Sequence, residues 1–217
     1  GLEKLACITI RDEKEENDET EGLQLLDERF LDKPALAMEQ SRTVAKYMAE
    51  ASRDCMLEAL SLFQEYKGEL EDKIVEDENK VDKYEDALGT YLVKLGQKDM
   101  SQKDSRDLSV ILHCIGDFER ISDHGVNIME SAKELHDKDL KFSDKALAEL
   151  AVISRAVEDI VKLSYQVFEE RDYKLAKKVE PLEEIIDELN QELKSRHVNR
   201  LREGKCTIEQ GFILSDG

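Results

Sequence analysis

Proline, glycine, tryptophan and basic residues are all scarce in this chain. Its 217 residues include 2 Pro, 10 Gly and no Trp. A β-sandwich or β-barrel needs many tight turns, which Gly and Pro largely supply, so the composition argues against both architectures. The 32 basic residues face 51 acidic ones, giving a formal net charge of −19. Such a chain gains nothing from neutralising phosphates, and nucleic acid is excluded as a partner.

Long apolar runs and paired cysteines are also missing. The longest stretch without a charged residue is 108–116, about half of the roughly 20 residues that a membrane helix needs. We therefore expect no membrane insertion by this segment. Cys7, Cys55, Cys114 and Cys206 form no close pair, which is typical of a reducing compartment. Cys55 and Cys114 are predicted to be small buried residues on helix faces.

Apolar residues recur at intervals of three and four, which predicts an all-α chain. The first helix should begin at Pro34 and end at about Lys67, before Gly68, and the second should span about 70–95. Ser101 to Asp104 resembles a capping box that opens the third helix. The remaining predicted helices start at Ser143 or Asp144 and end at about Arg171, span about 172–203, and begin at Thr207. Pro181 predicts a kink or a late start near Val179 in the fifth helix.

An internal repeat indicates two similar bundles. With an offset of 105 residues, Phe63 aligns with Phe168, Glu78 with Glu183 and Asp82 with Asp187. We therefore predict tandem antiparallel three-helix bundles over residues 36–137 and 143–217, the second incomplete in its last helix. Residues 1–35 are predicted to be an acidic linker, because 12–21 contains seven acidic residues in ten.

Two pairs of carboxylates occupy equivalent positions in this repeat. Glu78 and Asp82 lie one helical turn apart on one face, as do Glu183 and Asp187. Like charges at this spacing repel, and a cation would compensate them where a neighbouring helix removes water. By chance alone about ten such acidic pairs are expected in this chain, so each pair could also be a solvated surface. Their place in the repeat raises them above that background.

The third helix carries the most specific string, from Glu119 to Ile128. Glu119, Asp123 and Asn127 fall on one helical line and all offer oxygen ligands. The string resembles the E-R-x-x-D-H-x-x-N-I signature of PhoU-type domains, and the acidic pairs at 78/82 and 183/187 resemble that family's repeated metal-binding motif. The resemblance covers about residues 36–217.

The resemblance implies tandem helical bundles in a regulator of phosphate uptake that is not an enzyme. It also implies bound metal ions, with seven residues as the ligands: Glu78, Asp82, Glu119, Asp123, Asn127, Glu183 and Asp187. Oxygen ligands favour Fe, Mn, Mg or Ca over Zn. The second pair lacks its facing helix in this chain, and we expect it to bind metal more weakly or to depend on another molecule.

The resemblance also bears on cellular context. Residues 199–209 and the acidic segment before Pro34 look like the branch of the family fused to sodium-dependent phosphate cotransporters. That branch implies a membrane transporter portion upstream in the same polypeptide and a location at the cytoplasmic face of the cell membrane. A free-standing regulator of the phosphate ABC transporter is the alternative within the family.

Two further hypotheses remain, a helical scaffold without metal and a carboxylate-bridged metal hydrolase or oxidase. The enzyme would need an open metal position and a base, and no residue of the sequence suggests that base. An incomplete second bundle would also leave an apolar groove, which we expect to be closed by a homodimer or by the segment 207–216.

Overall fold

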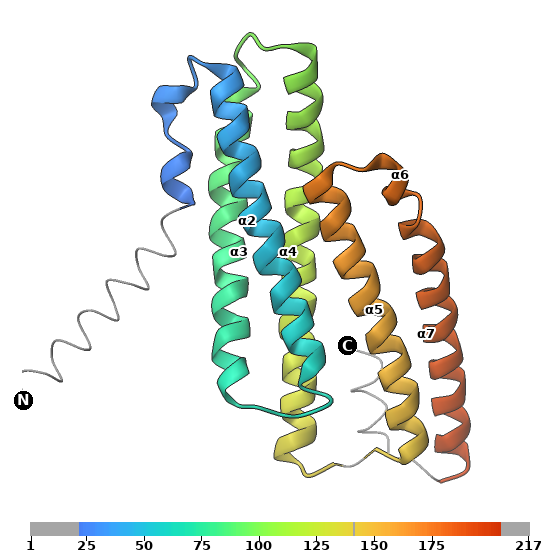
Figure 1. Cartoon of the computed structure of the whole chain (residues 1–217). Helices are drawn as coiled ribbons and strands as arrows, with labels where there is room; N and C mark the ends of the chain where they lie inside the picture. Colours follow the sequence, from blue (N-terminus) through green and yellow to red (C-terminus); the bar gives the residue numbers. More distant parts are fainter. Residues whose placement is uncertain (1–21, 141, 205–217) are drawn as a thin grey trace, which may run out of the picture. The chain divides into compact units, whose positions relative to one another are not determined.

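The computed structural model describes residues 22–140 and 142–204, and its long elements are all helices (Figure 1). In chain order, two 3-10 helices, η1 (Leu23–Leu25) and η2 (Glu28–Phe30), precede six α-helices. These are α2 (Pro34–Ser61), α3 (Glu69–Leu95), α4 (Gln102–Asp137), α5 (Asp144–Glu170), α6 (Tyr173–Ala176) and α7 (Val179–Arg202). Within the described residues there is no β-strand, and the all-α prediction is confirmed. No helix among them is both long and apolar enough to cross a membrane.

The structure contains the helix caps that the sequence predicted at Ser101 and Ser143. Ser101 Oγ accepts a hydrogen bond from the backbone N–H of Asp104 at 3.1 Å and donates to its carboxylate at 2.7 Å. Ser143 caps α5 by accepting from the N–H of Ala146 at 3.3 Å. The late start at Val179 is confirmed, since α7 begins there and Pro181 falls in its first turn, where a missing N–H costs little.

The first helix ends earlier than its apolar pattern predicted. α2 stops at Ser61 instead of Lys67, and the N–H groups of Gln64 and Glu65 both donate to the carbonyl of Ser61. Ser61 Oγ also donates to the carbonyl of Glu58 at 2.6 Å, a local bond that competes with helix continuation. Leu62 is nevertheless buried. The apolar pattern predicted the helix end too late because Leu62, although it lies after the last helical residue, is still buried.

Residues 22–33, the described part of the segment predicted to be an acidic linker, contain η1 and η2 and contact residues in and just after α3. Asp27 caps η2 by accepting from the N–H of Arg29 at 2.8 Å, and its carbonyl accepts from Tyr91 Oη at 3.1 Å. Lys94 on α3 pairs with Glu28, and Lys98, just after α3, pairs with Asp32 at 2.9 Å. Two lysines thus compensate two acidic residues of this segment. Residues 1–21 lie outside the described part.

The chain divides into two compact units, Gly1–Ala51 with Asn79–Glu119 and Ser52–Glu78 with Arg120–Gly217. This division cuts through α2, α3 and α4 and does not follow the predicted boundary between 137 and 143, which stays a prediction. In the first unit, the described residues bury apolar side chains of all three helices, among them Val44, Met48, Leu88, Leu92 and Ile111.

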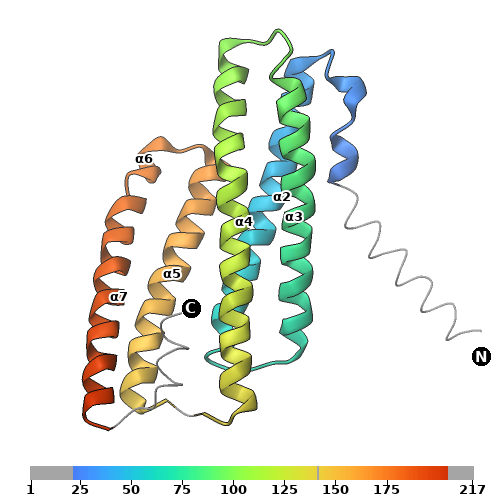
Figure 2. The ribbon, with the colours of Figure 1, turned by 180° about the vertical axis from the view of Figure 1, so that it is seen from behind.

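The second unit has its own core. Buried residues of α2, α3, α4 and α5, together with Leu62 just after α2, form one cluster: Cys55, Met56, Ala59, Leu60, Leu62, Ile74, Ile128, Met129, Ala132 and Val161. In this unit α5 and α7 lie side by side, with α6 in the connection between them (Figure 2). Only His197 of α7 is buried, while its apolar positions Leu182, Ile186, Leu189 and Leu193 are half-buried. The predicted sixth helix lies outside the described residues.

Candidate functional site

The first acidic pair lies on α3 beside the most deeply buried residues of that helix. Because α3 is continuous from Glu69 to Leu95, Glu78 and Asp82 are one turn apart. Val81, between them in sequence, is fully buried, while Glu78 is half-buried and Asp82 is exposed. This placement agrees with the expected position next to the helix seam.

The second string lies on α4 with the same relation to the core. Ser122 has no exposed surface, and Glu119 is half-buried. Asp123 and Asn127, further along the same line of the helix, are exposed. Both helices therefore present one half-buried carboxylate and at least one exposed oxygen ligand beside a buried seam.

Cys55 of α2 marks a point where three helices meet in the second unit. Its thiol lies 3.7 Å from the carbonyl oxygen of Ile74 on α3 and 3.6 Å from that of Ser122 on α4, and it donates to them as a weak hydrogen-bond donor. Gly125 allows this approach, since a Cβ there would lie 2.8 Å from the Cys55 sulfur and 3.4 Å from its backbone.

The pKa of this thiol is shifted by several nearby carboxylates. Burial raises the pKa of Cys55 to about 12, helped by the negative charges of Asp77, Glu58, Glu78 and Asp123 in that order. Glu78 and Asp123, from two predicted motifs on two helices, thus act on the same buried atom. The thiol stays protonated at neutral pH, so Cys55 is not a thiolate nucleophile under those conditions.

Two members of this acidic surround, Glu58 and Asp77, were missed by the sequence analysis. Glu58 Oε1 forms an ion pair with Lys73, while Glu58 Oε2 is buried without a hydrogen-bond partner in the described residues. Glu58 follows Cys55 by three positions on α2, a spacing that places both on one side of the helix. That relation was visible in the sequence, but nothing in a single sequence indicated that α3 and α4 face it.

The second acidic pair is more open than the first. Glu183 and Asp187 are exposed on α7, and the intervening Ile186 is half-buried. Glu149 of α5 contacts α7 further along that helix, where it pairs with Arg196 and Arg200. No third ligand stands beside this pair in the described residues.

The chemistry of the donors suits a hard cation, but their arrangement is loose. Carboxylates around Cys55 and the orphaned Glu58 Oε2 are the oxygen ligands that Mg²⁺, Ca²⁺ or Mn²⁺ prefer. Across residues 22–140 and 142–204, however, no group of three or more His, Cys, Asp or Glu side chains is arranged to hold a metal ion. Metal binding at the seven predicted ligands therefore stays a prediction.

Comparisons with known proteins point to one family. The chain matches the PhoU domain over residues 46–132 and 150–215. It is 30% identical over 111 residues to the phosphate-specific transport system accessory protein PhoU homolog 1 of Thermotoga maritima. That alignment covers 51% of this chain and 47% of the relative, so the chain spans about half the length of the curated relative it matches. No solved structure matches the chain.

Proposed function

Because this chain belongs to the PhoU domain family, we propose that it regulates phosphate transport and has no catalytic activity of its own. The observation that carries the proposal is the match to the family over both halves of the chain, 46–132 and 150–215. The Thermotoga relative, whose name places it as an accessory protein of a phosphate-specific transport system, supports the same assignment. The carboxylates that act on the Cys55 thiol are groups to which a cation could bind.

Two contexts for this regulator follow from different observations. The likeness of 199–209 and of the acidic N-terminal segment to cotransporter-fused domains favours a cytoplasmic module of a sodium-dependent phosphate cotransporter. The Thermotoga accessory protein favours a free-standing regulator at least as well. Sequencing the reading frame upstream of Gly1 decides between them: several apolar segments of about 20 residues support the fusion, and their absence supports the free regulator.

The regulatory proposal has a direct cellular test. Deleting the coding region of this chain from its host should remove the dependence of phosphate uptake on external phosphate, measured with radiolabelled phosphate. Restoring the chain should restore that dependence. Unchanged uptake at both low and high phosphate would contradict a role in phosphate transport.

We further propose that Glu78, Asp82, Glu119 and Asp123, with Asn127, hold a multivalent cation. The support is chemical: Glu78 and Asp123 raise the pKa of the same buried thiol, and a cation relieves the mutual repulsion of such carboxylates. A bound cation would supply positive charge that ties the acidic faces of the helices together. Glu183 and Asp187 would form a weaker second site that needs an additional ligand from elsewhere.

Metal analysis tests this part of the proposal. Protein purified without a metal affinity column should retain Fe, Mn, Mg or Ca, and the double variant Asp82→Ala with Asp123→Ala should retain much less. A matched control is Asp86→Ala with Glu130→Ala, which removes one exposed acidic residue from each of the same helices. Equal metal content in all three proteins, with equal helical circular dichroism, would exclude the assigned ligands.

A further inference from the structure

Arg200, in the last turns of α7, is an arginine that is only partly satisfied by its neighbours. Its Nη1 donates to Glu149 Oε2 on α5 at 2.7 Å, and its side chain is 16% exposed. Glu149 is shared, because its other oxygen accepts from Arg196 Nη1 at 3.1 Å. The same carboxylate therefore serves two guanidinium groups, and it meets Arg200 on one edge only.

The opposite edge of this guanidinium has no hydrogen-bond partner in the part of the chain that the structure describes. Nε and Nη2 of Arg200 are both buried and have no hydrogen-bond partner within the described residues. In a planar guanidinium, the N–H of Nε and one N–H of Nη2 point in the same direction and form a fork. This fork matches two oxygens of a carboxylate or phosphate, which is the geometry of bidentate arginine–oxyanion pairs.

Leaving this fork empty would be costly. Arginine keeps its charge at all accessible pH values, and each buried donor without a partner loses its hydrogen bond to water with no replacement. Arg42 offers a contrast in the same chain, because its Nη2 meets both Asp104 and Asp107, and Nε is its only nitrogen that is buried without a partner. Among the described residues, Arg200 is the one arginine with both fork nitrogens buried and unpaired.

The charged groups near the fork are already paired with one another, apart from the fork itself. Arg196, one turn earlier on α7, pairs with Glu149 and Glu192, and the pKa of the buried His197 is lowered, first by burial and then by the charge of Arg200. A lowered pKa means that His197 is neutral near pH 7 and does not add to the positive charge there. The positive charge offered to an oxyanion at the fork is therefore that of Arg200 itself, which does not change with pH.

We propose that the Nε–Nη2 edge of Arg200 is an oxyanion-binding site that takes a carboxylate or a phosphate in a bidentate manner. Two sources offer this chemistry. One is inorganic phosphate from solution, and the other is a carboxylate of this chain, for which Glu209 and Asp216 follow α7 in sequence outside the described residues. The proposal stands on the geometry of Arg200 and requires neither the bound metal nor the regulatory role.

The first arm of the test uses inorganic phosphate and the full chain. Titration calorimetry should detect phosphate binding by the wild type, and Arg200→Lys should weaken it at least tenfold, because lysine cannot form the fork. Arg42→Lys is the matched control and should leave the affinity unchanged. In ¹⁵N NMR spectra, the Nε–H resonance of Arg200 should shift on addition of phosphate, a readout that requires no variant.

The second arm asks whether the chain supplies the anion itself. In that case the wild type does not bind phosphate, while Glu209→Gln or Asp216→Asn exposes the fork and allows phosphate to bind. The same variant and Arg200→Lys should then lower the unfolding free energy non-additively in a double-mutant cycle. If neither the wild type nor either variant of the C-terminal carboxylates binds phosphate and the cycles are additive, no oxyanion occupies the fork and the proposal is wrong.

Discussion

Gly125 lies directly against Cys55, and this contact leads to a prediction with a built-in control. Alanine in place of glycine favours a helix by about 1 kcal/mol, but a Cβ at this position would lie 2.8 Å from the Cys55 sulfur and 3.4 Å from its backbone carbonyl. We expect Gly125→Ala to destabilise the chain by about 1–3 kcal/mol, the usual cost of overpacking. Urea unfolding followed by circular dichroism measures the change.

Gly116 on the same helix provides the comparison. A Cβ there meets nothing within 4 Å, so Gly116→Ala should gain up to about 1 kcal/mol from helix propensity alone. Equal effects of the two substitutions would contradict the close contact between α2 and α4 at Cys55.

The raised pKa of Cys55 makes stability depend on pH in the alkaline range. In the unfolded chain the thiol titrates near 9.0, whereas in the folded protein its pKa is about 12. The unfolded state therefore loses a proton first, and the stability that the neutral thiol contributes is present below pH 9 and is lost between pH 9 and 12. We expect Cys55→Ala to be less stable than the wild type at pH 8 because of its cavity, with a smaller difference at pH 10.5.

Tyr66, whose pKa is also raised to about 12 by its hydrogen bond to Glu71 and by burial, is present in both proteins and cancels in this comparison. Urea unfolding at the two pH values supplies the numbers. A difference between wild type and Cys55→Ala that is constant with pH would show that the thiol titrates normally.

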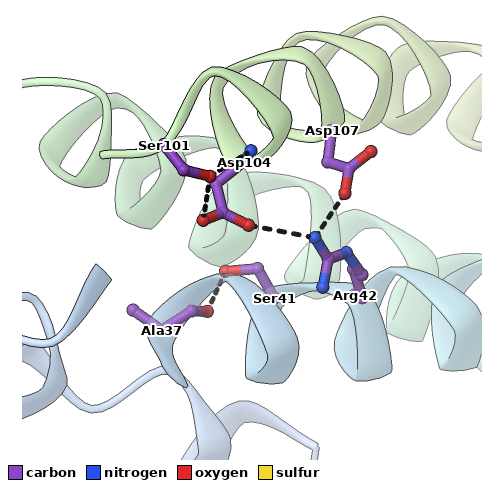
Figure 3. Close-up of polar contacts among 6 residues, drawn as sticks. All are labelled: Ala37, Ser41, Arg42, Ser101, Asp104 and Asp107. Atoms are coloured by element: carbon purple, nitrogen blue, oxygen red, sulfur yellow. Dashed lines mark hydrogen bonds and ion pairs between the residues drawn. The ribbon is translucent and has the colours of Figure 1, made fainter. Parts of the chain in front are cut away.

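At the scale of elements, α4 is fixed at its N-terminal end by a small network around Arg42 of α2 (Figure 3). Arg42 Nη2 lies 3.4 Å from Asp104 and also donates to Asp107. Asp104 in addition exchanges hydrogen bonds with Ser101 in the N-terminal cap. Asp104 thus takes part in both the cap and an ion pair with Arg42, and Asp107 makes the second ion pair with Arg42.

This division predicts a graded response to substitution. Asp104→Ala should cost about 1–2 kcal/mol because it removes a cap contact and an ion pair together. Asp107→Ala should cost below about 1 kcal/mol, and Ser101→Ala about 1 kcal/mol. Thermal unfolding of the three variants and of the Ser101→Ala, Asp104→Ala double variant tests this order. Fully additive effects of the last pair would mean that the two side chains do not share the cap.

At the scale of the whole molecule, the net charge of −19 opposes the compact state. Raising NaCl from about 10 to 150 mM shortens the screening length from about 30 to 8 Å. We expect a gain of about 1 kcal/mol and a rise of roughly 2–4 °C in Tm for a chain of this size. Scanning calorimetry in a buffer free of multivalent cations measures it.

A charge-reduced variant is the control for this effect. Replacing the exposed Glu180, Glu184 and Glu188 of α7 by Gln removes three negative charges without touching buried residues. Its Tm should respond less to NaCl than that of the wild type. An equal response would indicate that salt acts through something other than general repulsion.

Much of the fold was readable from local patterns because those patterns are properties of the backbone. Ser101, Ser143 and the start of α7 near Pro181 were predicted from capping and proline chemistry, which act within one turn. The predicted end of the first helix was wrong because a buried side chain lies beyond the end of the helical backbone. Leu62 stays in the apolar pattern after α2 has ended.

The sequence by itself determined the helical class, the excess of negative charge and the carboxylates that lie one turn apart, since spacing along one helix sets which residues share a face. Only the tertiary structure decided that Glu58 and Asp77 join Glu78 and Asp123 around Cys55, and that Arg200 keeps one edge without a partner. Contacts between residues of different helices depend on the rotation and axial position of each helix against its neighbours. Packing contacts between distant residues, such as Gly125 on Cys55, set those positions.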